Sequence, residues 1–332
     1  SYILSIVLLG GLFVFGKTVS GATSWYDLGG ISFQPSEFSK LGTAMMIAWY
    51  MGKFQSDIKR PRTLVSITIY LLIPSILIML QPDPGSALVY SAFYFPLLRE
   101  GLNFTFLIIF FSVLTLFFIS LSFEFIESIG IIGIIFLIIY FILKRFISKI
   151  KILPFLLSFI VSVGFSFSAD YIFNNLFEQR HRDRINIVIG KNVDVQGVGY
   201  NINQSKIAIG SGGLKGKGFL KGTQTKGDFV PEQQTDYIFS TVGEEWGFLG
   251  SITVIFMFCF LIIRILKRAE KQNSKFRRVF SYGVAGLIFV HFFVNIGMSL
   301  GIIPTIGIPL PFISYGGSSL LAFSLMIFIH LN

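Results

Sequence analysis

Residues 102–121 read LNFTFLIIFFSVLTLFFISL, a run of twenty residues without one charged side chain. A helix of about 20 apolar residues is long enough to cross roughly 30 Å of hydrocarbon. Similar runs recur along the chain. Strands are excluded as spanning elements, because the runs are uniformly apolar and do not alternate. We therefore expect an all-α polytopic membrane protein with about ten transmembrane helices. The expected spans are 2–16, 36–52, 64–80, 86–98, 102–121, 126–143, 152–172, 247–264, 279–300 and 316–331.

The composition excludes a soluble protein. Charged residues make up 13% of the 332 residues and hydrophobic residues 53%, with 39 Phe among them. A soluble domain carries roughly 25% charged residues. The formal charge of +10 indicates membrane topology and anionic lipid, not nucleic acid. The single Cys259 excludes a disulfide framework and a cysteine-based zinc site.

The distribution of Lys and Arg predicts the orientation. Basic residues gather in alternate connections, chiefly 53–62, 144–151 and 264–278. Cytoplasmic loops carry such an excess, whereas a long loop is translocated largely regardless of its charge. We therefore expect one integral membrane domain over 1–332, with an extracytoplasmic loop at 173–246 before the last three spans. The loops around 17–35, 81–85 and 301–315 are expected on the same outer side.

Two short outer segments contain polar residues next to spans. The first is GATSWYDLGGISFQPSEFSK (21–40), in which Glu37 and Lys40 are i,i+3 neighbours able to pair on one helix face. The alternative is a helix start with Trp25 as an interfacial anchor. The second is QPDPGSAL (81–88), where Asp83 lies between two prolines. Its alternative role is a tight turn between spans.

The long loop is rich in lysine and glycine. No acidic residue occurs from Val195 through Gly227, while glycines are interleaved with Lys206, Lys215, Lys217, Lys221 and Lys226. Glycine lets backbone N–H groups approach an anion, and lysine supplies positive charge, so the segment is suited to binding phosphate. Lys206 is the best single candidate. A flexible, solvated loop remains the alternative.

The end of the same loop carries two carboxylates. Glu232 and Asp236 are four residues apart, hence on one face if the segment is helical. A carboxylate half desolvated at the mouth of a membrane helix is a candidate for a raised pKa and for base chemistry. The alternative is that Asp236 is an N-cap.

The last polar segment is NIGMSLGIIPTIGIPLPFISYGGSSL (295–320), whose prolines and glycines break a helix at membrane depth. Irregular backbone is tolerated there only where it lines a cavity or is buried in protein. Asn295, Ser314 and Ser318 are candidate hydrogen-bonding residues. The small residues of the last two spans, including Gly283 and Gly286, form a candidate docking face for a partner helix, with packing inside the protein as the alternative.

Together and in this order, these segments resemble the RodA/FtsW/SpoVE family of bacterial cell-wall polymerases. The motifs are QPSEFSK (34–40), QPDPG (81–85), PEQQTD (231–236) and SYGGSS (314–319). Residues 204–224 are closer to RodA, the elongation member, than to FtsW, the division member. Two departures stand out: two early spans of the family are absent here, and three spans lie between Arg99 and the long loop where well-known members have one.

The resemblance implies a peptidoglycan glycosyltransferase that polymerises lipid II on the outer surface of the bacterial cytoplasmic membrane during cell elongation. It implies Asp236 as the catalytic residue and a class B penicillin-binding protein as partner. We expect substrate binding by Glu37, Lys40, Lys206, Glu232, Trp25, Asp83, Ser314 and Ser318. No cofactor is required by the sequence, although Mg²⁺ or Mn²⁺ would supplement the lysines. A lipid II flippase and a non-catalytic scaffold remain alternatives.

Overall fold

The computed structural model describes residues 1–19, 21–27, 29–30, 32–53, 56–146, 152–175, 177, 179–191 and 199–332. They form two compact units. Unit 1 comprises Ser1–Leu102 and Tyr200–Asn332, and unit 2 comprises Asn103–Gly199. Every residue predicted to belong to the site lies in unit 1. The prediction of a single membrane domain with an extracytoplasmic loop stays a prediction.

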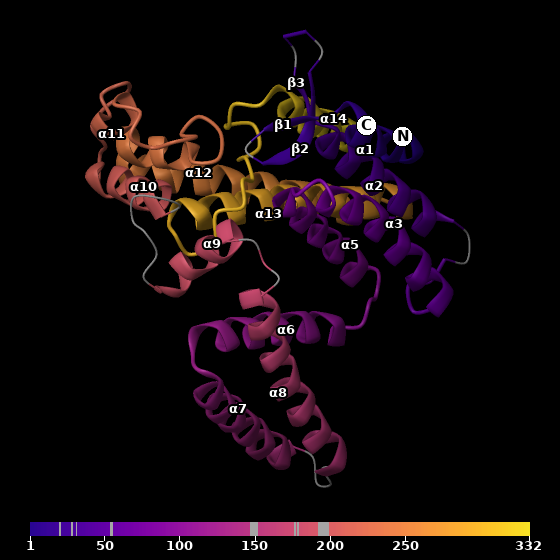
Figure 1. The fold of residues 1–332 in the computed structure, drawn as a ribbon. Helices are drawn as coiled ribbons and strands as arrows, with labels where there is room; N and C mark the ends of the chain where they lie inside the picture. The colour runs from indigo at the N-terminus through magenta and orange to yellow at the C-terminus, as the bar shows by residue number, and fades with distance from the viewer. Residues whose placement is uncertain are drawn as a thin grey trace. The chain divides into compact units, whose positions relative to one another are not determined.

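Unit 1 is built around helix α13 (Lys275–Ser299), which is buried along most of its length and packs against α2 and α12 (Figure 1). Glycines and small residues on α13 allow this close packing. The other helices of unit 1 are α1 (Tyr2–Phe15), α2 (Pro35–Gly52), α3 (Pro61–Met79), α4 (Pro84–Leu88), η1 (Val89–Phe93), α5 (Tyr94–Arg99), α10 (Gly199–Ser211), α11 (Thr223–Lys226), α12 (Ile238–Glu270) and α14 (Gly317–Leu331).

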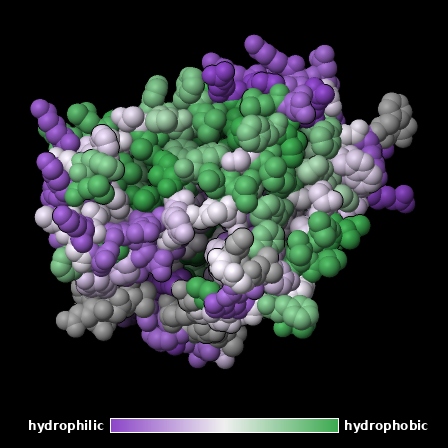
Figure 2. All heavy atoms as spheres, turned by 90° about the horizontal axis from the view of Figure 1, so that it is seen from above, coloured by the Kyte–Doolittle hydropathy of each residue, from purple (hydrophilic) through white to green (hydrophobic). Residues whose placement is uncertain are grey.

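The fold class is confirmed, but the count of ten spans is not. Six of the described helices are long and apolar enough to cross a membrane: α3, α6 (Thr105–Ser122), α7 (Phe125–Phe146), α8 (Ile152–Asn175), α12 and α13. The helices α1 and α14 are apolar but shorter. Large hydrophobic side chains are widely exposed, and hydrophobic residues cover broad areas of the face drawn in Figure 2. Such a surface needs lipid as its solvent.

The expected span at 86–98 is a chain of three short helices, α4, η1 and α5. Its start is fixed by Asp83, whose carboxylate accepts hydrogen bonds from Ser86 N (3.0 Å) and Ser86 Oγ (2.7 Å). Pro84 follows at the first helical position, where its missing N–H costs nothing. Asp83 is therefore the N-cap of α4, as the turn alternative anticipated.

A small antiparallel sheet is an addition to the predicted all-α fold. It has the order β1 (Lys17–Val19), β2 (Ala22–Asp27) and β3 (Ser32–Phe33), with Lys17 opposite Trp25. Lys17 Nζ donates to Asp27 at 2.8 Å. This hydrogen bond holds the pKa of the Asp27 carboxyl below its usual range. The pair is exposed, so it adds little to stability.

The long loop is largely helical. It contains α9, α10 and α11, and α12 begins at Ile238, nine residues before the expected span at 247. The extension is bent at Gly247, whose φ of 64° and ψ of −158° are not helical. The bend divides residues 238–246 of α12 from the apolar segment that follows.

The docking face predicted on α13 is wrong at its two central glycines. A Cβ added at Gly283 would lie 3.5 Å from the Phe93 ring, and one at Gly286 would lie 2.6 Å from the carbonyl oxygen of Ala92. These glycines let η1 pack closely against α13. The alternative, packing inside the protein, is the one that the structure shows.

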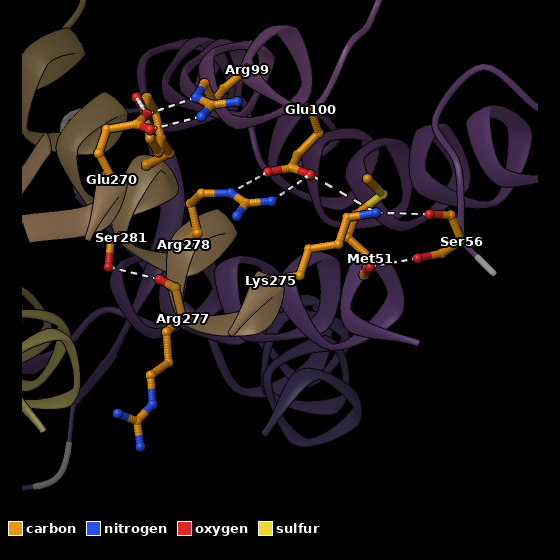
Figure 3. A network of polar contacts seen from close by, with 10 residues as sticks. Met51, Ser56, Arg99, Glu100, Glu270, Lys275, Arg277, Arg278 and Ser281 are labelled. Carbon is orange, nitrogen blue, oxygen red and sulfur yellow. Dashed lines mark hydrogen bonds and ion pairs between the residues drawn. The ribbon is translucent and has the colours of Figure 1, made fainter. Parts of the chain in front are cut away.

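A network of ion pairs lies where α5 and α12 end and α13 begins (Figure 3). Arg99 binds Glu270 through two nitrogens at 2.6 and 2.7 Å. The next residue, Glu100, accepts from Arg278 at 2.8 Å and lies 3.8 Å from Lys275 Nζ. The network joins the end of α5 to the end of α12 and the start of α13. None of the predicted site residues belongs to this network.

Unit 2 consists of α6 (Thr105–Ser122), α7 (Phe125–Phe146), α8 (Ile152–Asn175) and α9 (Gln179–Ile189). The helices α6, α7 and α8 pack against one another, in part through aromatic pairs such as Phe117–Phe173. A cavity of about 520 Å³ lies among residues that include Glu124, Glu127, Asp170 and Lys191. None of the predicted site residues lines it.

Candidate active site

The ion pair predicted from the i,i+3 spacing exists, and it is buried. Lys40 Nζ donates to Glu37 Oε1 at 2.6 Å, and the exposed fractions of the two side chains are 1% and 2%. Burying a charge is tolerated when it is paired and hydrogen-bonded. Glu37 also lies in the first turn of α2, where the positive end of the helix dipole favours a carboxylate.

A histidine that the sequence analysis did not single out completes this pair. Lys40 Nζ lies 2.9 Å from His291 Nε2, and His291 Nδ1 lies 2.9 Å from the carbonyl oxygen of Pro309. An ammonium group only donates, so Nε2 accepts and Nδ1 carries the proton that it donates to Pro309. The chain of contacts thus runs from α2 through α13 into the segment 300–316.

Asp236 lies in a turn whose backbone is held by α13. Asn295 Nδ2 donates to the carbonyl oxygen of Asp236 at 2.9 Å and to that of Ile308 at 2.8 Å. One buried amide therefore joins the turn to the segment 300–316. The Asp236 side chain is partly buried, and a Cβ added at Gly307 would lie 3.3 Å from its Oδ2. Gly307 has a φ of 72°, which favours glycine.

The residues just before Asp236 are held by the same segment. Ser314 Oγ donates to the carbonyl oxygen of Thr235 at 2.6 Å, and Tyr315 N donates to that of Gln234 at 2.8 Å. Ser314 Oγ also accepts from Leu310 N at 2.8 Å. Ser314 therefore positions the turn through its backbone.

The N-cap interpretation of Asp236 is wrong, because the N-cap of α12 is Tyr237. The expectation that Glu232 and Asp236 share a helix face also fails, since residues 231–237 form turns. Glu232 is exposed, has a φ of 54°, and accepts from Thr235 Oγ1 at 2.9 Å. Asp236 therefore does not act as the N-cap of α12.

The lysine-rich loop is ordered by Glu244, a second residue that the sequence analysis missed. Its carboxylate is fully buried and accepts from Lys217 Nζ at 2.8 Å and from the backbone N–H groups of Gln224 and Thr225 at 2.9 Å. Backbone donors at the start of α11 and a lysine together satisfy the buried charge. The Lys217 side chain is therefore already paired with Glu244.

Lys206 is exposed on α10 and lies against the segment 300–316. A Cβ added at Gly301 would lie 2.6 Å from Lys206 Nζ. Its neighbour Ser205 is buried and donates to the carbonyl oxygen of Ser299 at 2.8 Å. Lys206 therefore lies close to Gly301 while its side chain stays exposed.

The other predicted residues surround the same segment. Ser318 Oγ accepts from Gln34 N at 3.1 Å, which joins α14 to the start of α2. Asp83 Oδ2 lies 3.4 Å from Ser24 Oγ of β2, next to Trp25. A Cβ added at Gly85 would contact the carbonyl oxygen of Ile306. The segment 300–316 therefore contacts α4, α10, α13 and the Asp236 turn.

Two signals in the sequence pointed to the missed residues. His291 precedes Asn295 by four residues, hence on the same face of α13, and an ionisable residue within a span is a functional candidate by default. Glu244 is an acid just before an apolar span. Neither signal indicates which residues His291 or Glu244 contacts. Within the described residues, no group of three or more His, Cys, Asp or Glu side chains is arranged to hold a metal ion.

Comparison with known proteins identifies the family. The model of the FtsW/RodA/SpoVE cell cycle proteins matches residues 1–128 and 124–332, which is the whole chain. The chain belongs to this family. Among its FtsW/RodA/SpoVE relatives, peptidoglycan glycosyltransferase MrdB of Escherichia coli K12 is 34% identical over 321 residues, covering 96% of this chain and 73% of MrdB. Peptidoglycan glycosyltransferase RodA of Treponema pallidum is 33% identical over 331 residues, covering 92% and 76%.

Solved structures of the same family have the same fold. A chain from a peptidoglycan synthase complex that coordinates polymerization and crosslinking matches with a TM-score of 0.68 and 27% identity, over 99% of this chain and 79% of that one. Rod shape determining protein RodA of Thermus thermophilus matches with a TM-score of 0.58 and 22% identity, over 99% and 75%. This second likeness concerns the fold alone.

Proposed function

We infer that this FtsW/RodA/SpoVE family member is a peptidoglycan glycosyltransferase, as its relatives MrdB and RodA are named. We propose that it polymerises lipid II during cell elongation, on the outer face of the bacterial cytoplasmic membrane. The chain is a multi-pass membrane protein, and the proposed site lies at ends of its helices, where a lipid-linked substrate can bring its sugar headgroup.

The proposed chemistry requires a single base. The hydroxyl of one sugar attacks the anomeric carbon of another, the bond from that carbon to the diphosphate oxygen breaks, and the anomeric configuration inverts. Asp236 accepts the proton of the attacking hydroxyl. A glycosidase needs a second carboxyl group to protonate a leaving alkoxide. A diphosphate leaves as an anion and needs positive charge instead.

The cationic partner is proposed to be Lys206, with Lys215 and Lys221 as further accessible charges. Lys217 is excluded from this role by its pairing with Glu244. Trp25, Asp83, Glu232, Ser314 and Ser318 are proposed to border the bound substrate. Glu37 and Lys40, which are buried, are proposed to support the site from within, through His291.

One observation carries the proposal. Asn295, Ser314 and Tyr315 donate hydrogen bonds to backbone carbonyl groups of the turn that contains Asp236. The Asp236 side chain is half-buried and caps no helix. A carboxylate that is held in place in this way is suited to accept a proton from a bound substrate.

Polymerisation of fluorescent lipid II by the purified protein tests the proposal. Asp236→Asn preserves the shape of the side chain but cannot take up a proton, so we expect turnover to fall about 10²–10⁴-fold. Asp228→Asn is the matched control, because Asp228 is an exposed carboxylate eight residues away and is not proposed to contact the substrate. Equal turnover in Asp236→Asn and wild type would contradict the assignment. Lipid II transport across vesicles without polymerisation would favour the flippase alternative.

A class B penicillin-binding protein is the proposed partner. The structural neighbour in a complex that combines polymerization with crosslinking supports a crosslinking partner. Because Gly283 and Gly286 are covered by η1, its docking surface has to lie elsewhere than on these glycines. Co-purification with a candidate crosslinking enzyme, before and after substitutions on exposed faces of α12 and α14, would locate it.

A further inference from the structure

The segment 213–222, which we call the apolar loop, exposes large hydrophobic side chains between its lysines. The exposed fractions of Leu214, Phe219 and Leu220 are 71%, 66% and 67%. Isolated exposed hydrophobic residues are normal, whereas several gathered in one short loop indicate an interaction surface. Neither the proposed base chemistry nor the charge of the lysines explains them.

The apolar loop is fixed to α12 by backbone hydrogen bonds. Phe248 N donates to the carbonyl oxygen of Gly213 at 2.8 Å, and Gly218 N donates to that of Glu245 at 2.9 Å. Lys217 is bound on both sides, since its N–H donates to the Glu244 carbonyl oxygen at 3.0 Å and its Nζ to the Glu244 carboxylate at 2.8 Å. The hydrophobic side chains are therefore presented on a fixed backbone.

The bend of α12 makes this attachment possible. At Gly247 the φ of 64° turns the backbone away from the helical path, so Phe248 N is available to Gly213 and not to a carbonyl one turn back. A Cβ at Gly247 would lie 2.8 Å from the carbonyl oxygen of Gly213. Only a glycine allows the loop to approach the helix this closely.

The attachment also fixes the level of the loop along the membrane. The apolar part of α12 begins beside Gly247, and its side chains Phe248, Leu249 and Phe256 are more than half exposed. Trp246 packs against Phe219 with ring centroids 6.2 Å apart. Tryptophan is enriched at the boundary between hydrocarbon and headgroups. The loop therefore lies at the end of the membrane-crossing part of α12.

The charge of the loop suits anionic headgroups. Lys215 and Lys221 are exposed, and the sequence holds no acidic residue from 195 through 227. Basic side chains beside interfacial hydrophobic ones are typical of segments that lie on an anionic membrane surface. The partner favoured by this combination is a lipid surface.

We propose that the apolar loop is an interfacial anchor. Leu214, Phe219 and Leu220 enter the outermost part of the hydrocarbon beside α12, while Lys215 and Lys221 bind anionic headgroups. Glu244 and Gly247 hold the loop at this level. The anchor does not depend on the proposed catalytic activity, because it concerns which surface the loop contacts and not what the site does.

Nitroxide accessibility measured by electron paramagnetic resonance tests the anchor. The native cysteine is removed by Cys259→Ala, and single cysteines are introduced by Phe219→Cys and, separately, by Leu214→Cys. The control is Phe229→Cys, which is also exposed but lies outside the loop. Each protein is labelled and placed in vesicles of phosphatidylcholine with about 30% phosphatidylglycerol, a fraction chosen to give the negative surface that basic segments bind. Dissolved oxygen and a water-soluble nickel complex serve as collision partners.

We expect the labels at 219 and 214 to collide severalfold more often with oxygen than with the nickel complex, relative to the label at 229. Lys215→Ala with Lys221→Ala should reduce this ratio at 219, as should vesicles of phosphatidylcholine alone. Equal ratios at 214, 219 and 229 in the anionic vesicles would overturn the anchor. The anchor would also be overturned if the label at 219 were protected from the nickel complex only after a crosslinking enzyme is added. That result would favour a protein-binding face.

Discussion

Lys40 Nζ lies 2.9 Å from His291 Nε2, although the two residues are 251 positions apart in the chain. The contact joins α2, which carries the buried ion pair, to α13, which carries Asn295 and through it the Asp236 turn. Through this contact the Glu37–Lys40 pair helps to hold the proposed site in place. Substitutions in this chain of contacts should therefore affect both stability and turnover.

The buried pair should behave as one unit. Lys40→Met leaves the Glu37 carboxylate buried without its partner and should cost about 3–5 kcal/mol of stability. The double variant Glu37→Gln with Lys40→Met should cost clearly less than the sum of the single changes. Unfolding of the detergent-solubilised protein measures all three variants, and additive single effects would show that the two side chains do not interact.

His291 should act as a positioning residue for Pro309. His291→Leu removes both hydrogen bonds and leaves the Pro309 carbonyl group and Lys40 short of a partner, at about 1–3 kcal/mol for each buried group. His291→Gln offers one acceptor and one donor, and should restore most of the turnover. If His291 only fills space, His291→Leu should retain more turnover than His291→Gln, because leucine is then the better substitute. The readout is kcat for lipid II polymerisation, compared at equal folded fraction.

Glu244 should control the order of the lysine-rich loop. Glu244→Gln weakens charge-assisted hydrogen bonds worth about 1.5–3 kcal/mol each, so the amides of Gln224 and Thr225 should exchange faster with deuterium. Trypsin should also cleave more readily after Lys217 and Lys221. Lys226→Ala is the control, because Lys226 is exposed. Unchanged exchange at residues 224 and 225 in Glu244→Gln would contradict the role.

Removing the charge of one lysine at a time should distinguish a lysine that binds the substrate from one that does not. If Lys206 contacts the departing diphosphate, Lys206→Ala should lower kcat/KM about tenfold or more, since a charge-assisted hydrogen bond contributes about 1.5–3 kcal/mol and 1.4 kcal/mol is a factor of ten. Lys226→Ala should leave kcat/KM nearly unchanged. The reverse ranking would move the proposed anion site from α10 to the end of α11.

Gly307 should be required for the geometry of Asp236. In Gly307→Ala the φ of 72° becomes strained, at about 1–3 kcal/mol, and the new Cβ would lie 3.3 Å from Asp236 Oδ2. We expect turnover to fall. Gly29→Ala is a matched control, since Gly29 has a φ of 73° and no atom within 4 Å of an added Cβ. Equal turnover in the two variants would show that the contact with Asp236 has no effect.

Sequence patterns predicted the structural features that depend on residues close together in the chain. The Glu37–Lys40 pair follows from i,i+3 spacing, and the helices follow from apolar runs. The partners of these groups could not be predicted, because His291 meets Lys40 across 251 residues and Glu244 meets the loop through backbone N–H groups, which leave no trace in side-chain chemistry. Glycine-rich sequence suggested a flexible loop, whereas the same glycines allow close packing on α12.

The buried pair on α2 also has a consequence for biosynthesis. This helix is not among those apolar enough to cross the bilayer unaided, and the histidine that completes its polar contacts is made 251 residues later. At a synthesis rate of about 5–20 residues per second, that delay is roughly 10–50 s. During this time the charged side chains of α2 have to be kept out of contact with lipid. Packing against α1 and α3, the insertion machinery or the ion pair within α2 can do this. Assembly of the first half of the protein therefore finishes only when nearly the whole chain has been translated.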